Sequence, residues 1–214
     1  MKHIFPVREL HEFRDADFIG GHPALDFVNT VTGRNGAPRD WLAGPAAVAD
    51  WGEKAGLLTS RESRDFLALC SADPAMAQAA FERAIDLREA IYAFLDSVVR
   101  GIAPPAESLA KIESAWRSAA QESELVWTSD EGLAPEVAPG LPDIVRDRVA
   151  LSFVDLGREL TSGRLRRCAG GNCAWFFFDT SKAGRRRWCD MAVCGNTAKY
   201  ARARKAKRPG RDPR

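Results

Sequence analysis

The stretch CAGGNCAWFFFDTSKAGRRRWCDMAVCGNT, which runs from Cys168 to Thr197, decides how the end of this chain folds. It holds four of the five cysteines, spaced Cys168-x4-Cys173-x15-Cys189-x4-Cys194. Two close pairs of thiolates suit a closed tetrahedral zinc site, which is structural because it leaves no open position for a substrate. We therefore predict one structural zinc ion (Zn2+) held by these four cysteines.

A disulfide or dithiol redox system is the alternative for clustered cysteines. The x4 spacing differs from the C-x-x-C of dithiol chemistry, and the fifth cysteine, Cys70, leaves an odd number. The chain begins MKHIFPVREL, without the apolar run of a signal peptide, and no stretch approaches the roughly twenty apolar residues of a membrane span. We therefore expect a cytoplasmic protein with no membrane partner, where clustered cysteines are more often metal ligands.

Around the cysteines the sequence predicts a small fold that depends on zinc. The segment AWFFFD is predicted as a strand leaving the first cysteine pair, and RRRWC as the strand that returns to the second pair. Helix formers follow Cys194 as far as Pro209. A knuckle, a hairpin and a helix with the last ligand at its start describe a treble-clef finger, and its small core would be Trp175, Phe177 and Trp188.

The net charge of +2 conceals an uneven distribution. Residues 163–214 contain fifteen Lys and Arg against three acids, whereas residues 1–162 contain 16 basic and 26 acidic residues. A basic module attached to an acidic domain is typical of proteins that bind a polyanion. We expect two domains, residues 1–162 and 163–214, with duplex DNA as the partner of the second.

Phosphate contacts would come from the arginine triplet before the third cysteine and from the terminal helix. The candidate residues are Arg185, Arg186, Arg187, Lys199, Arg202 and Lys205. A run of charges is often only a solvated surface, and an acidic protein is the alternative partner. The sequence leaves the possibility of a homodimer open.

The first domain is predicted to be mostly helical. Breakers and capping patterns predict a short helix from Pro23, then helices over 46–55, after 59–62, from 74 onward, over 105–120 and over 142–160. The segment ELVWTSDEGLAPEV, residues 124–137, has two β-rich runs around a polar turn and is predicted as a hairpin. The fold class is therefore α+β.

The long helix after Pro74 contains a charge in an apolar face. On a helical wheel Arg88 falls within the stripe that Phe81, Ile91 and Leu95 share. A guanidinium cannot lose its proton, so a buried one needs a carboxylate, carbonyl groups or an anionic ligand. We expect either an ion pair with Asp26 or a polar pocket for a small anionic or polar effector, formed by His22, Asp26, Asn29 and Arg88.

Enzyme activity is the competing interpretation, and we expect none. Nucleases built on zinc folds need histidine as a ligand or base, but His3, His11 and His22 all lie in the first 22 residues. An acid/base site around His22 in the first domain is the second catalytic alternative, although a histidine before a helix-opening proline is more often a cap.

The motif WCDMAVCGNTAKYARAR, with the upstream C-x4-C and FFFDTSKAGRRR, resembles the CGNR zinc-finger family. GGHPALDFVNTV and DLREAIYAFL resemble the ABATE domain, its usual N-terminal partner. Together the two resemblances cover nearly the whole chain. They imply a bacterial, stress-induced transcription regulator, in which an α+β ligand-binding domain precedes a DNA-binding treble clef.

Carried over by position, the family's zinc ligands are the same four cysteines, and its Gly-Asn signature falls on Gly195 and Asn196. The signature arginine is replaced by Thr197. Any DNA contact that this arginine makes in relatives is therefore absent here, and we expect Lys199 or Arg202 to replace it.

Overall fold

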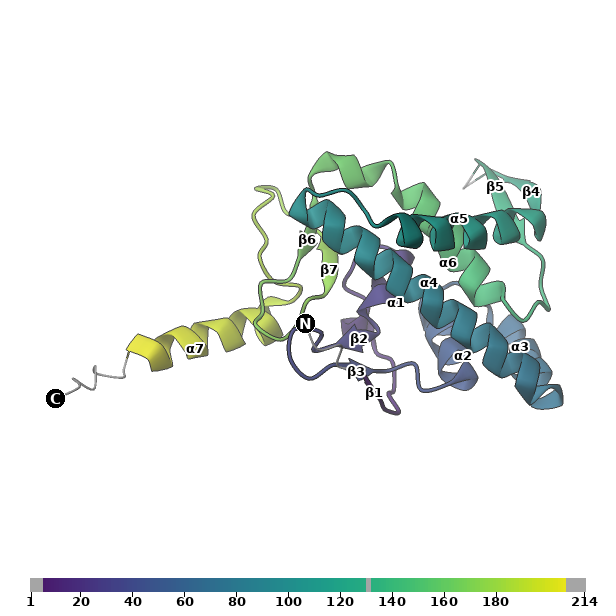
Figure 1. Ribbon diagram of the computed structural model, residues 1–214, viewed down its shortest axis with the longest axis horizontal. Coiled ribbons are helices and arrows are strands. Elements are labelled where there is room, and N and C mark those ends of the chain that lie inside the picture. Colours follow the sequence, from purple (N-terminus) through teal and green to yellow (C-terminus); the bar gives the residue numbers. More distant parts are fainter. Residues whose placement is uncertain (1–5, 130–131, 207–214) are drawn as a thin grey trace.

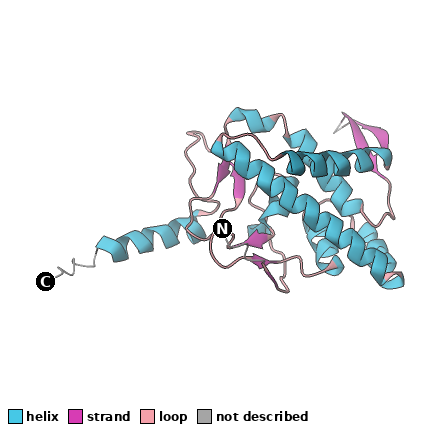
Figure 2. Cartoon of the chain, in the orientation of Figure 1, coloured by secondary structure: helices cyan, strands magenta, loops and turns pink. Residues whose placement is uncertain are grey.

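The computed structural model describes residues 6–129 and 132–206. Six α-helices build the body, and a seventh, α7, extends away from it at the end of the described chain (Figure 1). Small sheets lie at the edges of this helical body (Figure 2). The α+β fold class is confirmed, with a mostly helical N-terminal part and a C-terminal cysteine cluster.

The helices of the body begin close to the predicted positions. The caps explain why: Thr59 and Glu62 form the predicted reciprocal capping box of α3, and Asp73 accepts the Met76 N–H at the start of α4. The helices are α1 (Pro23–Asn29), α2 (Pro45–Lys54), α3 (Ser60–Ala72), α4 (Pro74–Arg100), α5 (Ala106–Gln121) and α6 (Ile144–Leu156).

Helix α6 is shorter than the predicted 142–160. It ends at Leu156, before Gly157, and the chain continues into a 3-10 turn over Glu159–Ser162. Glycine is among the poorest helix formers, which accounts for the earlier end. None of the helices in the described part of the chain combines the length and apolarity needed to cross a membrane.

The predicted hairpin is present. Strands β4 (Ser123–Thr128) and β5 (Gly132–Val137) pair antiparallel at the end of the molecule opposite α7 (Figure 1). Val137 at its base is buried in the core, whereas Leu125 and Trp127 are exposed. The hairpin therefore packs on α5 and α6 through its base.

A three-stranded sheet was not predicted. Its strands β1 (Val7–Arg8), β2 (Val31–Thr32) and β3 (Arg39–Asp40) are two residues long each, and β3 lies between the other two. Segments this short show no alternation of apolar and polar residues, so sequence periodicity cannot reveal them.

The C-terminal segment contains β6 (Leu165–Arg167), β7 (Phe176–Phe178), a π-helical turn (Met191–Gly195) and α7 (Asn196–Ala206). The prediction that RRRWC forms the second strand is wrong, because β7 pairs antiparallel with β6 instead. The backbone N–H of Arg186 donates to the Asp179 carboxylate, which removes it from any strand ladder.

The β6–β7 hairpin packs into the core of the helical body. Phe176 and Phe178 belong to the same buried cluster as Phe27 and Ile91, while Trp175 and Phe177 pack beside the cysteines. Alternate faces of one strand thus contact the two parts of the molecule. The cysteine-bearing segment is consequently attached to the helical body by buried aromatic side chains.

Candidate metal centre and nucleic-acid interface

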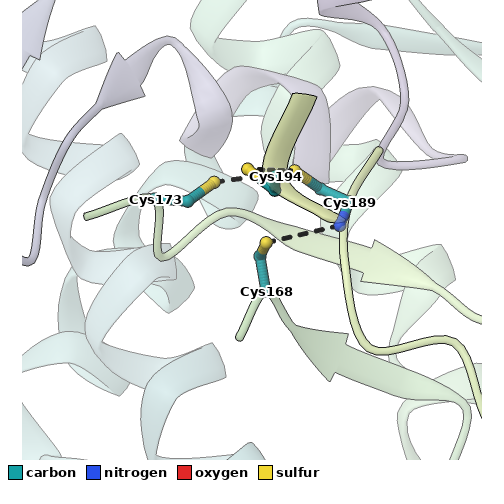
Figure 3. Close-up of side chains that lie close together, drawn as sticks. All are labelled: Cys168, Cys173, Cys189 and Cys194. Atoms are coloured by element: carbon teal, nitrogen blue, oxygen red, sulfur yellow. Dashed lines mark hydrogen bonds between the residues drawn. The ribbon is translucent and has the colours of Figure 1, made fainter. Parts of the chain in front are cut away.

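Four cysteine side chains converge at the predicted zinc site (Figure 3). Their sulfur atoms all lie within 4.8 Å of one another, and Cys173 and Cys194 each place theirs 3.6 Å from that of Cys189. A tetrahedron with Zn–S bonds of about 2.3 Å has edges of about 3.8 Å. The donor set and its spacing therefore fit one structural zinc ion, as predicted.

The first cysteine pair lies on a tight turn between β6 and β7. Cys173 is followed by Ala174, whose φ of 66° lies in the left-handed region. A Cβ atom on Gly170 would lie 3.2 Å from the Cys194 sulfur. A side chain at this position would crowd the metal ligands, so the close approach favours glycine.

Backbone donors prepare the site for a metal. The N–H groups of Gly170 and Cys189 point to the Cys168 sulfur at 3.4 and 3.3 Å. The Cys173 thiol and these donors together hold the pKa of Cys168 below its usual range, whereas burial raises that of Cys194. Zinc binds cysteine as the thiolate, so metal binding releases the protons that these thiols carry.

The small core around the cysteines is the predicted one. Trp175, Phe177 and Trp188 pack with the buried Cys168 and Cys189. Trp41, from the N-terminal part, adds an edge-to-face contact with Trp175, 5.5 Å between ring centroids. No local sequence pattern indicates this contribution, because Trp41 is remote along the chain.

Buried hydrogen bonds join this core to the first domain. The Asn29 side chain donates to the Phe176 carbonyl at 2.8 Å and accepts the Phe176 N–H at 2.9 Å. The Trp175 indole N–H donates to the Val31 carbonyl at 3.1 Å. Asn29 therefore caps the edge of β7 as a neighbouring strand would.

The arginine triplet divides into two roles. Arg185 and Arg187 are exposed, but Arg186 donates to the carbonyls of Trp188 and Cys189 and lies over the Phe177 ring. Arg186 therefore holds the loop before the third cysteine. The sequence did not separate its role from that of its neighbours, since all three are arginines.

Helix α7 exposes Lys199 and Arg204 to solvent. Of these two, Lys199 is a predicted DNA-binding residue; the side chains of the other predicted residues on α7, Arg202 and Lys205, lie outside the described residues. At the signature position, the Thr197 hydroxyl donates to the Val193 carbonyl one turn back, 2.8 Å away. It is therefore engaged with its own helix.

Two family comparisons agree with this architecture. Residues 21–159 match the ABATE family, described as "Putative stress-induced transcription regulator", and residues 164–207 match the CGNR zinc finger. The chain belongs to the ABATE family. No curated protein matches the sequence. The matched families are of regulator and zinc-finger type rather than enzyme families.

Arg88 in the ABATE domain is buried, but it does not pair with Asp26. Only 1% of Arg88 is exposed, and its guanidinium makes two 2.7 Å hydrogen bonds to the carboxylate of Asp40. It also contacts Thr30 at 3.0 Å and Glu89 at 3.0 Å. The predicted pairing with Asp26 is wrong: the carboxylate of Asp40, on β3, is the partner of the guanidinium, whereas Asp26 accepts a backbone N–H.

The other residues of the expected effector pocket have separate partners. His22 accepts the Ala24 N–H as the cap of α1, and Asn29 bonds to Phe176. Asp26 accepts the Gly20 N–H at 2.7 Å. The structure therefore does not bring the four residues together around one cavity.

His11, like His22, makes specific contacts within the protein. His11 stacks on Trp41 at 3.8 Å between ring centroids and bonds to Asp17 at 2.8 Å, while His3 lies outside the described residues. Within residues 6–129 and 132–206, the four cysteines are the group of His, Cys, Asp and Glu side chains close enough to hold a metal.

Asp26 gives the ABATE domain a testable pH dependence. Burial raises the pKa of this carboxyl from 3.8 to about 7. The folded state then holds a proton that the unfolded state has lost, so stability falls as pH rises from about 4 to about 7. We expect a slope approaching about 1.4 kcal/mol per pH unit, measured by urea unfolding.

The control for this experiment is Asp26→Asn, which keeps an acceptor for the Gly20 N–H. Its slope over the same pH range should be shallower than that of the unsubstituted protein. Equal slopes would show that Asp26 is ionised in the folded protein.

Proposed function

We propose that this protein is a cytoplasmic transcription regulator whose zinc finger binds duplex DNA through phosphate contacts. Its ABATE domain senses a small molecule, and the finger adopts the treble-clef arrangement. The family descriptions support a regulator in general terms. The finer assignment rests on the surface charge of the finger.

The observation that carries the proposal is that several cations of the finger are exposed, whereas its described acids accept hydrogen bonds from their own loops. Arg185, Arg187, Lys199 and Arg204 are exposed. Asp179 is 1% exposed and accepts hydrogen bonds from Ser181 and Arg186. The Asp190 carboxylate accepts the Val193 N–H at 2.7 Å. Within residues 163–206 these two acids are thus used locally, which leaves a positive surface suited to phosphate.

The place of α7 supports the same conclusion. It extends away from the helical body, and its main contacts are with the π-helical turn that carries Cys194 (Figure 1). A projecting helix with cations along it can enter a DNA groove without displacing other parts of the protein. The zinc site fixes the start of this helix.

The test is the salt dependence of binding to a mixed-sequence DNA duplex. If about four cations contact phosphates, log Kobs should fall with log salt with a slope of roughly −3.6. The double variant Arg185→Ala/Arg187→Ala should reduce the slope to roughly −1.8, since each lost phosphate contact removes about 0.9.

The matched control removes the same charge from the first domain. The control variant is Arg61→Ala/Arg64→Ala. Both arginines are exposed on α3, and the Arg61 side chain is 87% exposed. This variant should retain the slope of the unsubstituted protein. An equal loss in both double variants would mean that net charge alone drives binding.

A protein partner is the second candidate function. The π-helical turn and α7 expose the apolar side chains Met191, Val193 and Tyr200, at 58%, 65% and 69%. Phosphate contacts do not require these groups, whereas a protein interface would bury them. Absence of DNA binding even at low salt would favour this candidate.

A further inference from the structure

A cavity of about 920 Å³ lies between the loop after α2, helices α5 and α6, and strand β5. Pockets of a few hundred to about 1,000 Å³ are the usual size for small-molecule sites. The cavity lies on the hairpin side of the ABATE domain, and its lining includes none of the four residues expected to bind an effector. Its apolar wall includes Leu58, Trp116, Val126, Leu133, Leu151 and Val154.

An ion pair between Arg148 and Glu62 forms part of the cavity lining. Arg148 donates to Glu62 at 2.5 Å and to the carbonyls of Leu57 and Val137 at 2.5 and 3.3 Å. The hydrogen bond from Arg148 lowers the pKa of Glu62 to about 2, so this carboxylate stays charged at neutral pH. The Arg148 guanidinium is thus neutralised and already committed to protein acceptors.

The remaining charged groups of the lining are two acids and one base. The acids are Glu136 and Asp155 and the base is Arg158, and all three are exposed. Together with the Arg148–Glu62 pair, the lining carries one net negative charge. Residues 1–162 as a whole are also acidic, so the local field disfavours an anion and attracts a cation.

Trp116 adds a surface on which such a cation can bind. Trp116 is 38% exposed, and it lines the cavity from α5. An indole attracts a nearby ammonium group through its negative ring face and also packs against flat apolar groups. Both properties select a molecule with an aromatic or alicyclic body and one positive charge.

We propose that this cavity binds a small organic cation with a flat apolar body. The inference rests on the sensing role proposed above and replaces the anionic effector expected from sequence. Ser152, Asp155 and Arg158 of the lining belong to α6 or to the turn that follows it. The same chain continues through Glu159–Ser162 into β6, which leads to Cys168, so occupancy can be transmitted to the finger.

Three naphthalene derivatives, one cationic, one neutral and one anionic, test the site by calorimetry at pH 7. They are 2-(1-naphthyl)ethylamine, 1-naphthaleneethanol and 1-naphthaleneacetate. The amine should bind about tenfold more tightly than the acetate, with the alcohol between them, because one net acidic charge faces each probe. Tightest binding by the acetate, or no binding of any probe, would overturn the proposal.

Two variants test whether the probes bind in the cavity. Ser152→Trp fills it from α6 and should abolish binding, whereas Ser71→Trp adds the same side chain to the exposed surface of α3 and should not. Asp155→Lys alters only an exposed position and should reverse the order of amine and acetate. Unchanged binding in Asp155→Lys and in folded Ser152→Trp would place the probes elsewhere and overturn the assignment.

Probe binding needs no DNA, so this result is separate from the test of the proposed function. A protein that binds the amine but no DNA would retain the cavity assignment and lose the regulator proposal. A protein that binds DNA with the expected salt slope but none of the probes would do the reverse.

Discussion

Replacing Asp40 with alanine should lower the free energy of unfolding by about 3–5 kcal/mol. The substitution leaves the Arg88 guanidinium, only 1% exposed, without the carboxylate that makes two hydrogen bonds to it. An arginine cannot respond by losing its proton, and Glu89, the carboxylate that remains beside it, already accepts two hydrogen bonds from Arg34. Urea unfolding at pH 7 measures the loss.

The control is Asp65→Ala on α3. Asp65 faces Arg61 at 3.8 Å in an exposed ion pair, which contributes on the order of 0.5 kcal/mol or less. The double variant Arg88→Met/Asp40→Leu should recover much of the loss, because no unpaired charge remains. If Asp40→Ala costs no more than Asp65→Ala, the buried pair does not stabilise the ABATE domain.

Replacing Cys189 with serine should have the second large effect. A structural zinc site supplies about 10–16 kcal/mol of apparent binding free energy in small finger peptides, and one lost thiolate opens it. The finger should lose its zinc and its protection from hydrogen exchange. The matched control, Cys70→Ser, changes a half-buried thiol on α3 and should keep one zinc per chain.

The same substitution should also weaken the ABATE domain. Phe176 and Phe178 on β7 are part of its buried core, and Asn29 bonds to the backbone of Phe176. Loss of one buried Phe costs about 3–5 kcal/mol, so thermal unfolding of the helical body should occur at a lower temperature. An unchanged transition would show that the two parts fold independently.

The helices and the zinc cluster could be predicted from sequence because their signals are local. Thr59 and Glu62 lie three residues apart and cap each other, and the cysteine spacing alone fits a tetrahedron. The β4–β5 hairpin also follows from two β-rich runs around a polar turn. The caps and the hairpin join close neighbours along the chain, and the two cysteine pairs are recognised by their ligand chemistry and internal spacing.

The partner of Arg88 could not be predicted, since the pairing joins segments 48 residues apart. A helical wheel shows that Arg88 faces the core, but Asp40 sits on a two-residue strand without periodicity. The role of Arg186 was hidden in the same way, because it depends on carbonyls that become close only when the loop folds. Tertiary contacts of this kind leave no local sequence pattern.

The most direct measurement is the affinity of the full chain for a mixed-sequence duplex at low salt, before and after zinc is removed and then restored. Because the four cysteines fix the start of α7 and the loop with Arg185 and Arg187, we predict that binding disappears with the metal and returns with one equivalent of zinc. Equal affinity in the zinc-free protein, or no binding by the zinc-loaded protein, would contradict the account.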